Sequence, residues 1–385
     1  MLIDLDTTPP PVRPRDRRAV PALAAALPLL LLLLLLQGAA PADRLGELTA
    51  VLETGVVSSS LLAPDAFYLA RPNGVVEARP LAPGGPRWSA QVGVDAPNVT
   101  LAGDVLVVRP GALFLDARTG RRLWRTPDPS VVRVFGDRVA YVNSDGLLRV
   151  ADLATGRVRW QRQTSDRALD GDPGRRYLLG IGDEEQATLY SAADGTILAA
   201  GQGLGIDPYA LGIGLAVGQI TDEFVGDVLY TYGQTSVAAY SLTDLELKWD
   251  VRIEEPSLLG ACGSLICTTG DRGATAIDPA TGEVRWTNPR WRSIAPDGLT
   301  VAADQAVVRI DPATGRVERE VGRGGLVGDL LLRYDRNRTF VTGLSDGRVF
   351  GVVPVTALGD CTTAGDFLAC RIGDRSVTVW RFTDS

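Results

Sequence analysis

A motif that joins a turn to a tryptophan recurs along this sequence and constrains the fold more than any other feature. Its clearest copies read LDARTGRRLW at 115–124, ADLATGRVRW at 151–160 and IDPATGEVRW at 277–286. The Asp and Thr of each copy can accept backbone N–H groups and the Gly can adopt a positive φ, so the centre has the chemistry of a tight turn. Each copy therefore predicts a β-hairpin with one bulky side chain at a fixed place.

The spacing of the turns indicates a β-propeller. The turn glycine stands four residues before the Trp of each copy, and Gly84, Gly120 and Gly156 are 36 residues apart. In further copies the same position is occupied by Gly195, Leu245, Gly282, Gly315 and Gly347. Short alternating runs such as VLVVRP at 105–110 fill the intervals, without helical periodicity after residue 60. Four short strands per period are typical of a propeller blade.

Packing between blades explains the residue types of the motif. Each sheet of a propeller needs a bulky side chain against its neighbour, and Trp can supply it while its indole N–H binds an acceptor. The Asp and Thr side chains satisfy backbone donors at the turn. Ala199, Arg319 and Gly351 replace Trp in the weaker copies. We expect a structural role for the motif set Trp88, Asp116, Gly120, Trp124, Asp152, Gly156, Trp160, Trp249, Asp278, Gly282, Trp286, Asp311 and Gly315.

The turns predict an all-β protein with a propeller of eight four-stranded blades. Strands left over at 367–372, 376–382 and 47–63 allow a count of nine, but we expect eight because propellers usually have no more than about eight blades. We also expect the two ends of the chain to share one blade, since this removes exposed sheet edges.

The N-terminal part has a different composition and predicts one transmembrane helix. Residues 1–18 form a Pro- and Arg-rich tail, and residues 19–40 lack charged side chains. The arginines before the apolar span favour a cytoplasmic N-terminus, which places the propeller outside the cytoplasm. The alternative is a signal peptide cleaved near Ala40-Pro41-Ala42, with secretion of the remainder. The expected domains are the tail, the helix, a linker with a closing strand at 41–59, and the propeller at 60–385.

The four cysteines suit this extracytoplasmic location. Each pair spans a Gly-containing turn signal between two apolar half-strands, and neither has C-x-x-C spacing. We therefore expect two hairpin disulfides, Cys262–Cys267 and Cys361–Cys370.

Composition excludes several kinds of active site. The chain has no His, and Lys248 is its only lysine. A His base, a His metal ligand and a P-loop lysine elsewhere are therefore excluded. The net charge of −7 argues against binding to nucleic acid. We predict no catalytic residues and no metal site.

The repeated A-x-D-x-x-T-G-x-x-x-W pattern resembles the PQQ-like, or quinoprotein alcohol dehydrogenase-like, β-propeller repeats. The resemblance covers roughly residues 60–382. It implies a propeller fold, and the family it points to contains both PQQ-dependent dehydrogenases and non-catalytic assembly scaffolds. The layout of Arg-rich tail, Leu-rich segment and one propeller is similar to membrane-anchored actinobacterial members.

Departures from the dehydrogenase pattern favour a scaffold. The resemblance would imply adjacent cysteines and a calcium site with carboxylate and Asn ligands, and neither maps onto this sequence. We therefore predict no cofactor, and expect a membrane-tethered, non-catalytic scaffold that binds other envelope or membrane proteins. The alternatives are a PQQ-binding oxidoreductase with a metal in the propeller funnel, and a propeller that senses a small ligand or glycan of unknown identity.

Irregular parts of the repeat are the places where a site is expected. The longest interval contains the Gly-rich stretch 201–224, which is either a long loop or a functional insertion on one face. The acidic groups at 183–185 and 222–224 are too sparse for a cation site, and Trp291 is expected to pack. We expect a site near 201–224 or at the funnel.

Overall fold

Nine four-stranded antiparallel sheets make up the computed structural model. It describes residues 48–382 except 83, 128, 173, 175, 184–185, 203, 205–221, 226, 234, 355–357 and 374. Within the compact unit that extends from Glu47 to Ser385, each sheet is one propeller blade. The predicted β-propeller is confirmed, and the predicted number of eight blades is wrong.

Each of the first eight blades takes four consecutive strands. Blades 1 to 3 consist of β2 (Ser59–Leu62), β3 (Ala66–Ala70), β4 (Val75–Pro80) and β5 (Trp88–Gln91); β6 (Asn98–Ala102), β7 (Val105–Arg109), β8 (Leu113–Asp116) and β9 (Arg122–Arg125); and β10 (Pro129–Phe135), β11 (Arg138–Asn143), β12 (Leu147–Asp152) and β13 (Val158–Gln163).

Blades 4 to 6 follow the same order. They consist of β14 (Ala168–Gly171), β15 (Tyr177–Ile181), β16 (Ala187–Ser191) and β17 (Ile197–Gly201); β18 (Asp222–Val225), β19 (Val228–Tyr232), β20 (Ser236–Ser241) and β21 (Leu247–Arg252); and β22 (Pro256–Cys262), β23 (Leu265–Gly270), β24 (Gly273–Ile277) and β25 (Val284–Asn288).

Blades 7 to 9 complete the set. They consist of β26 (Trp291–Ile294), β27 (Leu299–Ala302), β28 (Ala306–Ile310) and β29 (Val317–Arg323); β30 (Gly325–Val327), β31 (Leu330–Asp335), β32 (Arg338–Gly343) and β33 (Val349–Val353); and β34 (Leu358–Ala364), β35 (Phe367–Ile372), β36 (Ser376–Arg381) and β1 (Thr49–Glu53).

Blade 9 explains the error in the count. Its strand order is β34, β35, β36 and β1, with Thr49 paired with Arg381 and Glu53 paired with Thr378. The outer strand comes from the N-terminal side of the chain, as expected for closure. No turn motif connects β36 to β1, because these strands belong to opposite ends of the chain. Eight turns therefore mark nine blades.

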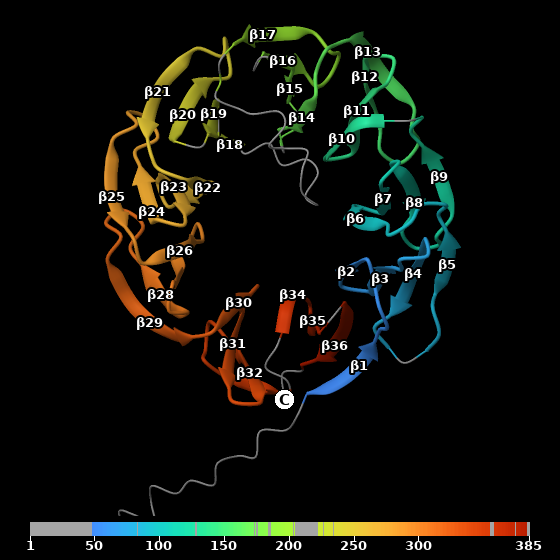
Figure 1. The fold of residues 1–385 in the computed structure, drawn as a ribbon, viewed down its shortest axis with the longest axis vertical. Helices are drawn as coiled ribbons and strands as arrows, with labels where there is room; N and C mark the ends of the chain where they lie inside the picture. Colours follow the sequence, from blue (N-terminus) through green and yellow to red (C-terminus); the bar gives the residue numbers. More distant parts are fainter. Residues whose placement is uncertain are drawn as a thin grey trace, which may run out of the picture. The chain divides into compact units, whose positions relative to one another are not determined.

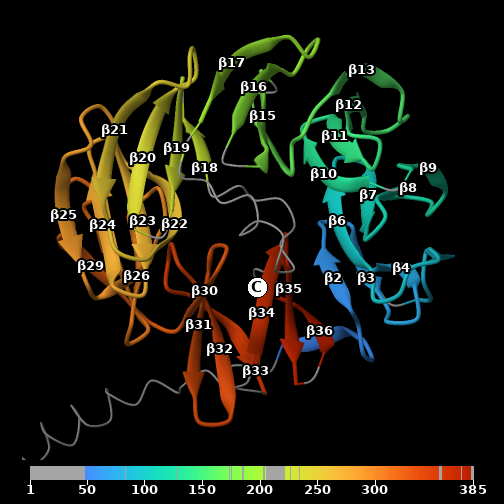
Figure 2. The ribbon, with the colours of Figure 1, turned by 45° about the horizontal axis from the view of Figure 1, so that its top comes forward.

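The blades follow one another around a ring, with β2, β6, β10 and their equivalents nearest the centre (Figure 1). The turned view shows the same succession of sheets (Figure 2). Hydrophobic clusters lie between neighbouring blades; one joins Phe67 and Leu69 of blade 1 to Val377 and Val379 of blade 9. Among the described residues, such clusters join every neighbouring pair of blades except 7 and 8.

Both expected disulfides are present, and each links neighbouring strands of one blade. Cys262 and Cys267 lie on β22 and β23, and Cys361 and Cys370 lie on β34 and β35. Residues 1–47 fall outside the described part, so the helix predicted for 19–40 stays a prediction. The described part contains no helix with the length and apolar character to span a membrane.

Candidate interaction site

Five tryptophans join one blade to the next. The ring of Trp286 in blade 6 lies against Gly315 in blade 7, where an added Cβ would come within 2.7 Å of the ring. Its Nε1 donates a hydrogen bond of 2.8 Å to the carbonyl oxygen of Pro312. Because Gly315 has a φ of 68°, glycine suits both the turn and the close approach. The same contacts occur in the pairs Trp88–Gly120, Trp124–Gly156, Trp160–Gly195 and Trp249–Gly282.

The hydrogen bonds of these tryptophans also repeat. In every pair, the indole N–H donates to the carbonyl oxygen of the residue that stands three positions before the glycine. The other four acceptors are Ala117, Leu153, Ala192 and Pro279. We call each Trp with its glycine and carbonyl acceptor a plug. A plug buries an aromatic ring and satisfies its polar atom at the same time.

The turn that carries the glycine and the carbonyl acceptor is the receiving half of a plug, and an aspartate stabilises this turn. Oδ1 of Asp116 accepts the backbone N–H groups of Arg118 and Thr119 at 3.1 and 2.9 Å. The hydroxyl of Thr119 donates to the same oxygen and is the largest cause of the lowered pKa of Asp116. Burial acts to raise that pKa, and the backbone N–H groups of Thr119 and Arg118 lower it further. Asp278 and Asp311 accept backbone N–H groups in their own turns, and Asp152 pairs with Arg157 and Arg159.

A size exchange replaces the plug between blades 4 and 5. Ala199 stands in the place of Trp, and Leu245 stands in the place of the turn glycine. Both side chains are buried in one cluster, so the larger residue has moved to the opposite blade. Leu245 has a φ of 58°, a conformation that costs an ordinary side chain about 1 kcal/mol or more. Packing at this junction therefore outweighs local backbone strain.

The junction between blades 7 and 8 has neither a plug nor a size exchange like that of Ala199 and Leu245. Arg319 stands in the place of Trp and pairs across the sheet with Arg309. Gly347 keeps the positive φ of a receiving glycine, at 69°, but no atom lies within 4 Å of where its Cβ would be. Two arginines directly opposite each other are unfavourable neighbours in a sheet. Among the described residues no hydrophobic cluster joins blades 7 and 8, so this junction is open where the others are packed.

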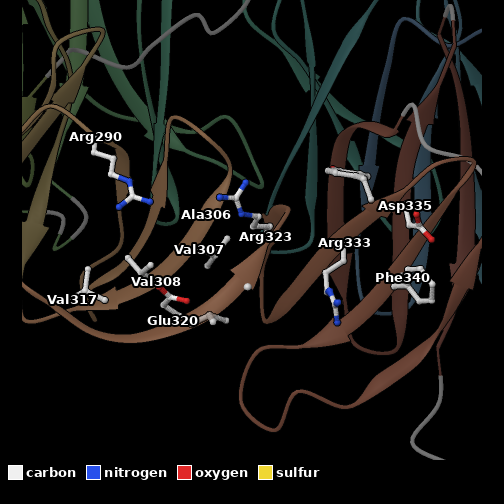
Figure 3. A pocket seen from close by; sticks show the side chains of 13 residues that line it. Arg290, Ala306, Val307, Val308, Val317, Glu320, Arg323, Arg333, Asp335 and Phe340 are labelled. Carbon is white, nitrogen blue, oxygen red and sulfur yellow. The ribbon is translucent and has the colours of Figure 1, made fainter. Parts of the chain in front are cut away.

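A cavity of about 730 Å³ lies at the open junction (Figure 3). Its lining includes Val317 and the run from Glu320 to Arg323 on β29, together with residues of β28, β31 and β32. Phe340 contributes an aromatic ring from blade 8. The cavity combines apolar surface with charged groups, as recognition sites commonly do.

Three guanidinium groups give the cavity its charge. Figure 3 shows Arg290 and Arg323 on the side of blade 7, and Arg333 on the side of blade 8. Asp304 holds the first two, with N–O distances of 3.5 Å to Arg290 and 3.1 Å to Arg323. Desolvation acts to raise the pKa of Asp304, but the backbone N–H of Ala306 and the two guanidinium charges outweigh it and lower that pKa. The carboxylate is therefore ionised at neutral pH and pairs with both exposed arginines.

Arg333 differs from the other two cationic side chains. Within the described residues it has no ion-pair partner, and its strand neighbour across the sheet is Phe340. Glu320 and Asp335 are the acidic side chains of the lining, and Asp335 lies 4.0 Å from Arg338. The guanidinium group over the Phe340 ring is that of Arg338, 5.2 Å from the ring centroid, so that of Arg333 can bind a carboxylate.

The expected sites receive less support from the geometry. Residues 203 and 205–221 of the Gly-rich stretch lie outside the described part, so its role stays a prediction. Near the centre of the ring, a cavity of about 440 Å³ lies between blades 2 and 3. Arg109 and Arg133 line it, and Arg133 pairs with the buried Asp170. Burial lowers the pKa of Arg109, and the charge of Arg133 lowers it further.

The residues do not fit the cofactor of the quinoprotein dehydrogenases. The cysteines are bonded between strands as hairpin staples, and the sequence has no adjacent pair to place beside a quinone. The described residues contain no group of three Asp, Glu, Cys or His side chains arranged to hold a metal ion. Of the other residues considered, Trp291 is packed between blades 6 and 7, and Asp183 pairs with Arg167.

Sequence reasoning missed the three arginines of the cavity. Arg290, Arg323 and Arg333 lie outside the repeat register and resemble other surface arginines in the sequence. The available signal was Arg319, which interrupts the Trp series with a charge. Reading that substitution as an open junction, and not as a weak copy, would have pointed to blades 7 and 8.

Comparison with known proteins relates the chain to one family and one fold. The family model described as outer membrane protein assembly factor BamB matches residues 72–207 and 183–356. No curated protein matches the chain significantly. The crystal structure of BamB from Moraxella catarrhalis is 19% identical, with 88% of this chain and 98% of that chain covered and a TM-score of 0.50.

Two further solved structures share the fold at lower identity. The computationally designed Ika8 protein is 11% identical, with coverage of 88% and 100% and a TM-score of 0.51. The C-terminal WD40 domain of Sif2 is 10% identical, with coverage of 89% and 100% and a TM-score of 0.51. At these identities the likeness shows the architecture alone.

Proposed function

The chain belongs to the PQQ-like repeat family described by outer membrane protein assembly factor BamB, and we propose from this premise that it is a non-catalytic interaction scaffold. Its propeller presents a rigid surface for other envelope or membrane proteins. A closed ring of packed sheets suits this role, because binding requires little ordering of the scaffold itself.

The open junction between blades 7 and 8 is the observation that carries the proposal. Its cavity offers guanidinium groups for carboxylates, together with Phe340 and the exposed Val317 for apolar contact. Charge-assisted hydrogen bonds beside buried apolar surface are the usual ingredients of a protein interface. Arg290 and Arg323 both pair with Asp304, which keeps the two guanidinium groups close to each other at the cavity.

A membrane tether through residues 19–40 completes the proposed arrangement. The uncharged span and the arginines before it support an anchor with a cytoplasmic N-terminus and a propeller outside the cytoplasm. Cell fractionation and the mass of the mature chain test this point. Full-length protein in the membrane fraction is expected, and mature protein that begins near Asp43 in the medium would show secretion after cleavage instead.

Co-purification from solubilised envelopes tests the scaffold function. We compare the full chain with a triple variant, Arg290→Ser, Arg323→Ser and Arg333→Ser, and with a matched control, Arg118→Ser, Arg121→Ser and Arg122→Ser, on exposed positions of blade 2. A partner that the control retains and the cavity variant loses is the expected result. Equal recovery with both variants, or quinone-dependent alcohol oxidation by the purified chain, would reject the proposal.

A further inference from the structure

The junction between blades 7 and 8 retains the receiving half of a plug. Gly347 has a φ of 69°, close to the 68° of Gly315, which receives Trp286. The carbonyl of Leu344 stands three residues before Gly347, the place of the acceptor in every plug. The backbone N–H of Leu344 donates to the backbone carbonyl oxygen of Asp329 at 2.9 Å, just as that of Ala117 donates to the carbonyl oxygen of Asp104 at 2.9 Å. The turn is thus built like the turns that bind an indole.

The donating half of the plug is missing. Arg319 occupies the Trp place on β29, exposed and, among the described residues, without an ion-pair partner. Its cross-strand neighbour Arg309 pairs with Asp297 at 3.0 Å, so Arg319 contributes the uncompensated charge at this position. Where a blade of this chain normally supplies an aromatic ring, blade 7 supplies a guanidinium group.

The junction between blades 9 and 1 shows that a missing Trp need not leave a junction open. Gly84 also lacks a tryptophan, and only Pro80 approaches it. That junction is filled by a cluster that includes Val57, Leu62 and Phe67. Blades 7 and 8 have the cavity instead of a cluster. The open junction is therefore a particular property of this pair of blades.

We propose that a partner protein supplies the missing plug to the junction between blades 7 and 8, and this inference rests on the proposed scaffold function. The occupant is an extended segment with one aromatic residue, Trp above all, and a neighbouring carboxylate. The ring lies against Gly347, and its N–H donates to the carbonyl oxygen of Leu344.

The arginines of this chain determine which groups of the partner segment fit beside the aromatic ring. The guanidinium group of Arg319 can stack on the incoming ring, since a cation over an indole face is attracted to it. Arg333 and the Asp304-held pair Arg290 and Arg323 are available to the carboxylate.

The shape of the cavity indicates an extended segment. Val317 and the run from Glu320 to Arg323 line it on β29, a strand of 7 residues, and Arg319 stands between them on the same strand. At a rise of about 3.3 Å per residue, an extended peptide of similar length spans roughly 20 Å. Such a segment is long enough to place an aromatic residue beside Arg319 and a carboxylate near Arg323 or Arg333.

Peptide binding to the full chain in detergent provides the test. The probe is a fluorescein-labelled nine-residue peptide with a central Trp flanked by Glu, measured by anisotropy against its Trp→Ala and Glu→Gln versions. Arg319→Trp restores the internal plug, and Arg122→Trp introduces a Trp on the exposed outer strand β9 as the control. We expect Arg319→Trp to weaken binding of the probe at least tenfold and to raise Tm, while Arg122→Trp changes neither.

The possible results separate a failure of the plug from a failure of the scaffold function. A probe that binds no better than its Trp→Ala version, or binds Arg319→Trp as well as the wild-type chain, would overturn the plug. If an envelope partner still depends on the three cavity arginines in that case, the scaffold function stands without the plug. Self-association of the wild-type chain that Arg319→Trp abolishes would identify a second copy as the occupant and would also overturn the proposal.

Discussion

The indole ring of Trp286 lies on Gly315 of the next blade, and this pair links blades 6 and 7 through an aromatic contact and a hydrogen bond to Pro312. Because of this contact, a Gly→Ala substitution should lower the free energy of unfolding by different amounts at Gly315 and at Gly347. Gly315→Ala places a Cβ within 2.7 Å of the ring, whereas Gly347→Ala meets no atom within 4 Å.

Both alanine variants experience the same backbone strain, because their φ values are 68° and 69°. We expect Gly347→Ala to lower the free energy of unfolding by about 1 kcal/mol. Gly315→Ala should cost about 1–3 kcal/mol more, as overpacking does. Urea unfolding followed by tryptophan fluorescence measures the difference, and equal losses would show that the Trp contact has no energetic weight.

The hydrogen bond of a plug can be separated from its packing at Trp286. Trp286→Phe keeps an aromatic ring and loses the donor to Pro312, so we expect a loss of about 1 kcal/mol plus a smaller packing defect. Trp286→Ala removes the ring and should cost about 3–5 kcal/mol. Chemical denaturation of the two variants provides the comparison, and similar losses would contradict a contribution from packing.

Ala199 and Leu245 should be energetically coupled, since they exchange the sizes of Trp and Gly. Ala199→Trp alone collides with Leu245, and Leu245→Gly alone leaves a void while it relieves the positive φ. The double variant rebuilds a plug, so its stability should exceed the sum of the single effects by about 1–3 kcal/mol. A double-mutant cycle measures this coupling, and additive losses would indicate that the two side chains pack independently.

A buried carboxyl gives the stability a defined pH dependence. Asp166 is 5% exposed, and burial raises its pKa although Thr164 and Tyr190 donate hydrogen bonds to it. Burial, and then the charge of Asp166, raises the pKa of Tyr190 to about 12. A raised carboxyl pKa favours the folded state fully below the ordinary value of 3.8, and this contribution is lost as the pH rises through the folded value.

Asp166→Asn should therefore raise Tm at pH 7 and have little effect on it below pH 3.8. Asp194→Asn is the control variant, for which the opposite change in Tm is expected. The backbone N–H of Thr196 and then the Ser191 hydroxyl lower the pKa of Asp194, so removal of this carboxylate should lower Tm at pH 7 and not at acidic pH. Calorimetry across this range checks both, and a parallel response of the two variants would contradict the assignment.

The repeat predicted most of the fold because turn chemistry and large aromatics are local signals. Gly156 and Trp124, for example, can be placed in register from sequence alone. The ninth blade was not predicted because its closure pairs Thr49 with Arg381, residues that no local pattern relates. Arg333 was not predicted for a similar reason, since its importance depends on the blade that faces it.

Photo-crosslinking at two equivalent positions tests the scaffold account most directly. Val317 lines the cavity, and Val158 occupies the same place in blade 3 beside a closed plug; the two are 47% and 42% exposed. A photoreactive amino acid is placed at either position in the full-length, membrane-bound chain. Adducts with a defined envelope protein at position 317 and none at 158 are predicted. Adducts at both positions, or at 158 alone, would contradict a partner bound between blades 7 and 8.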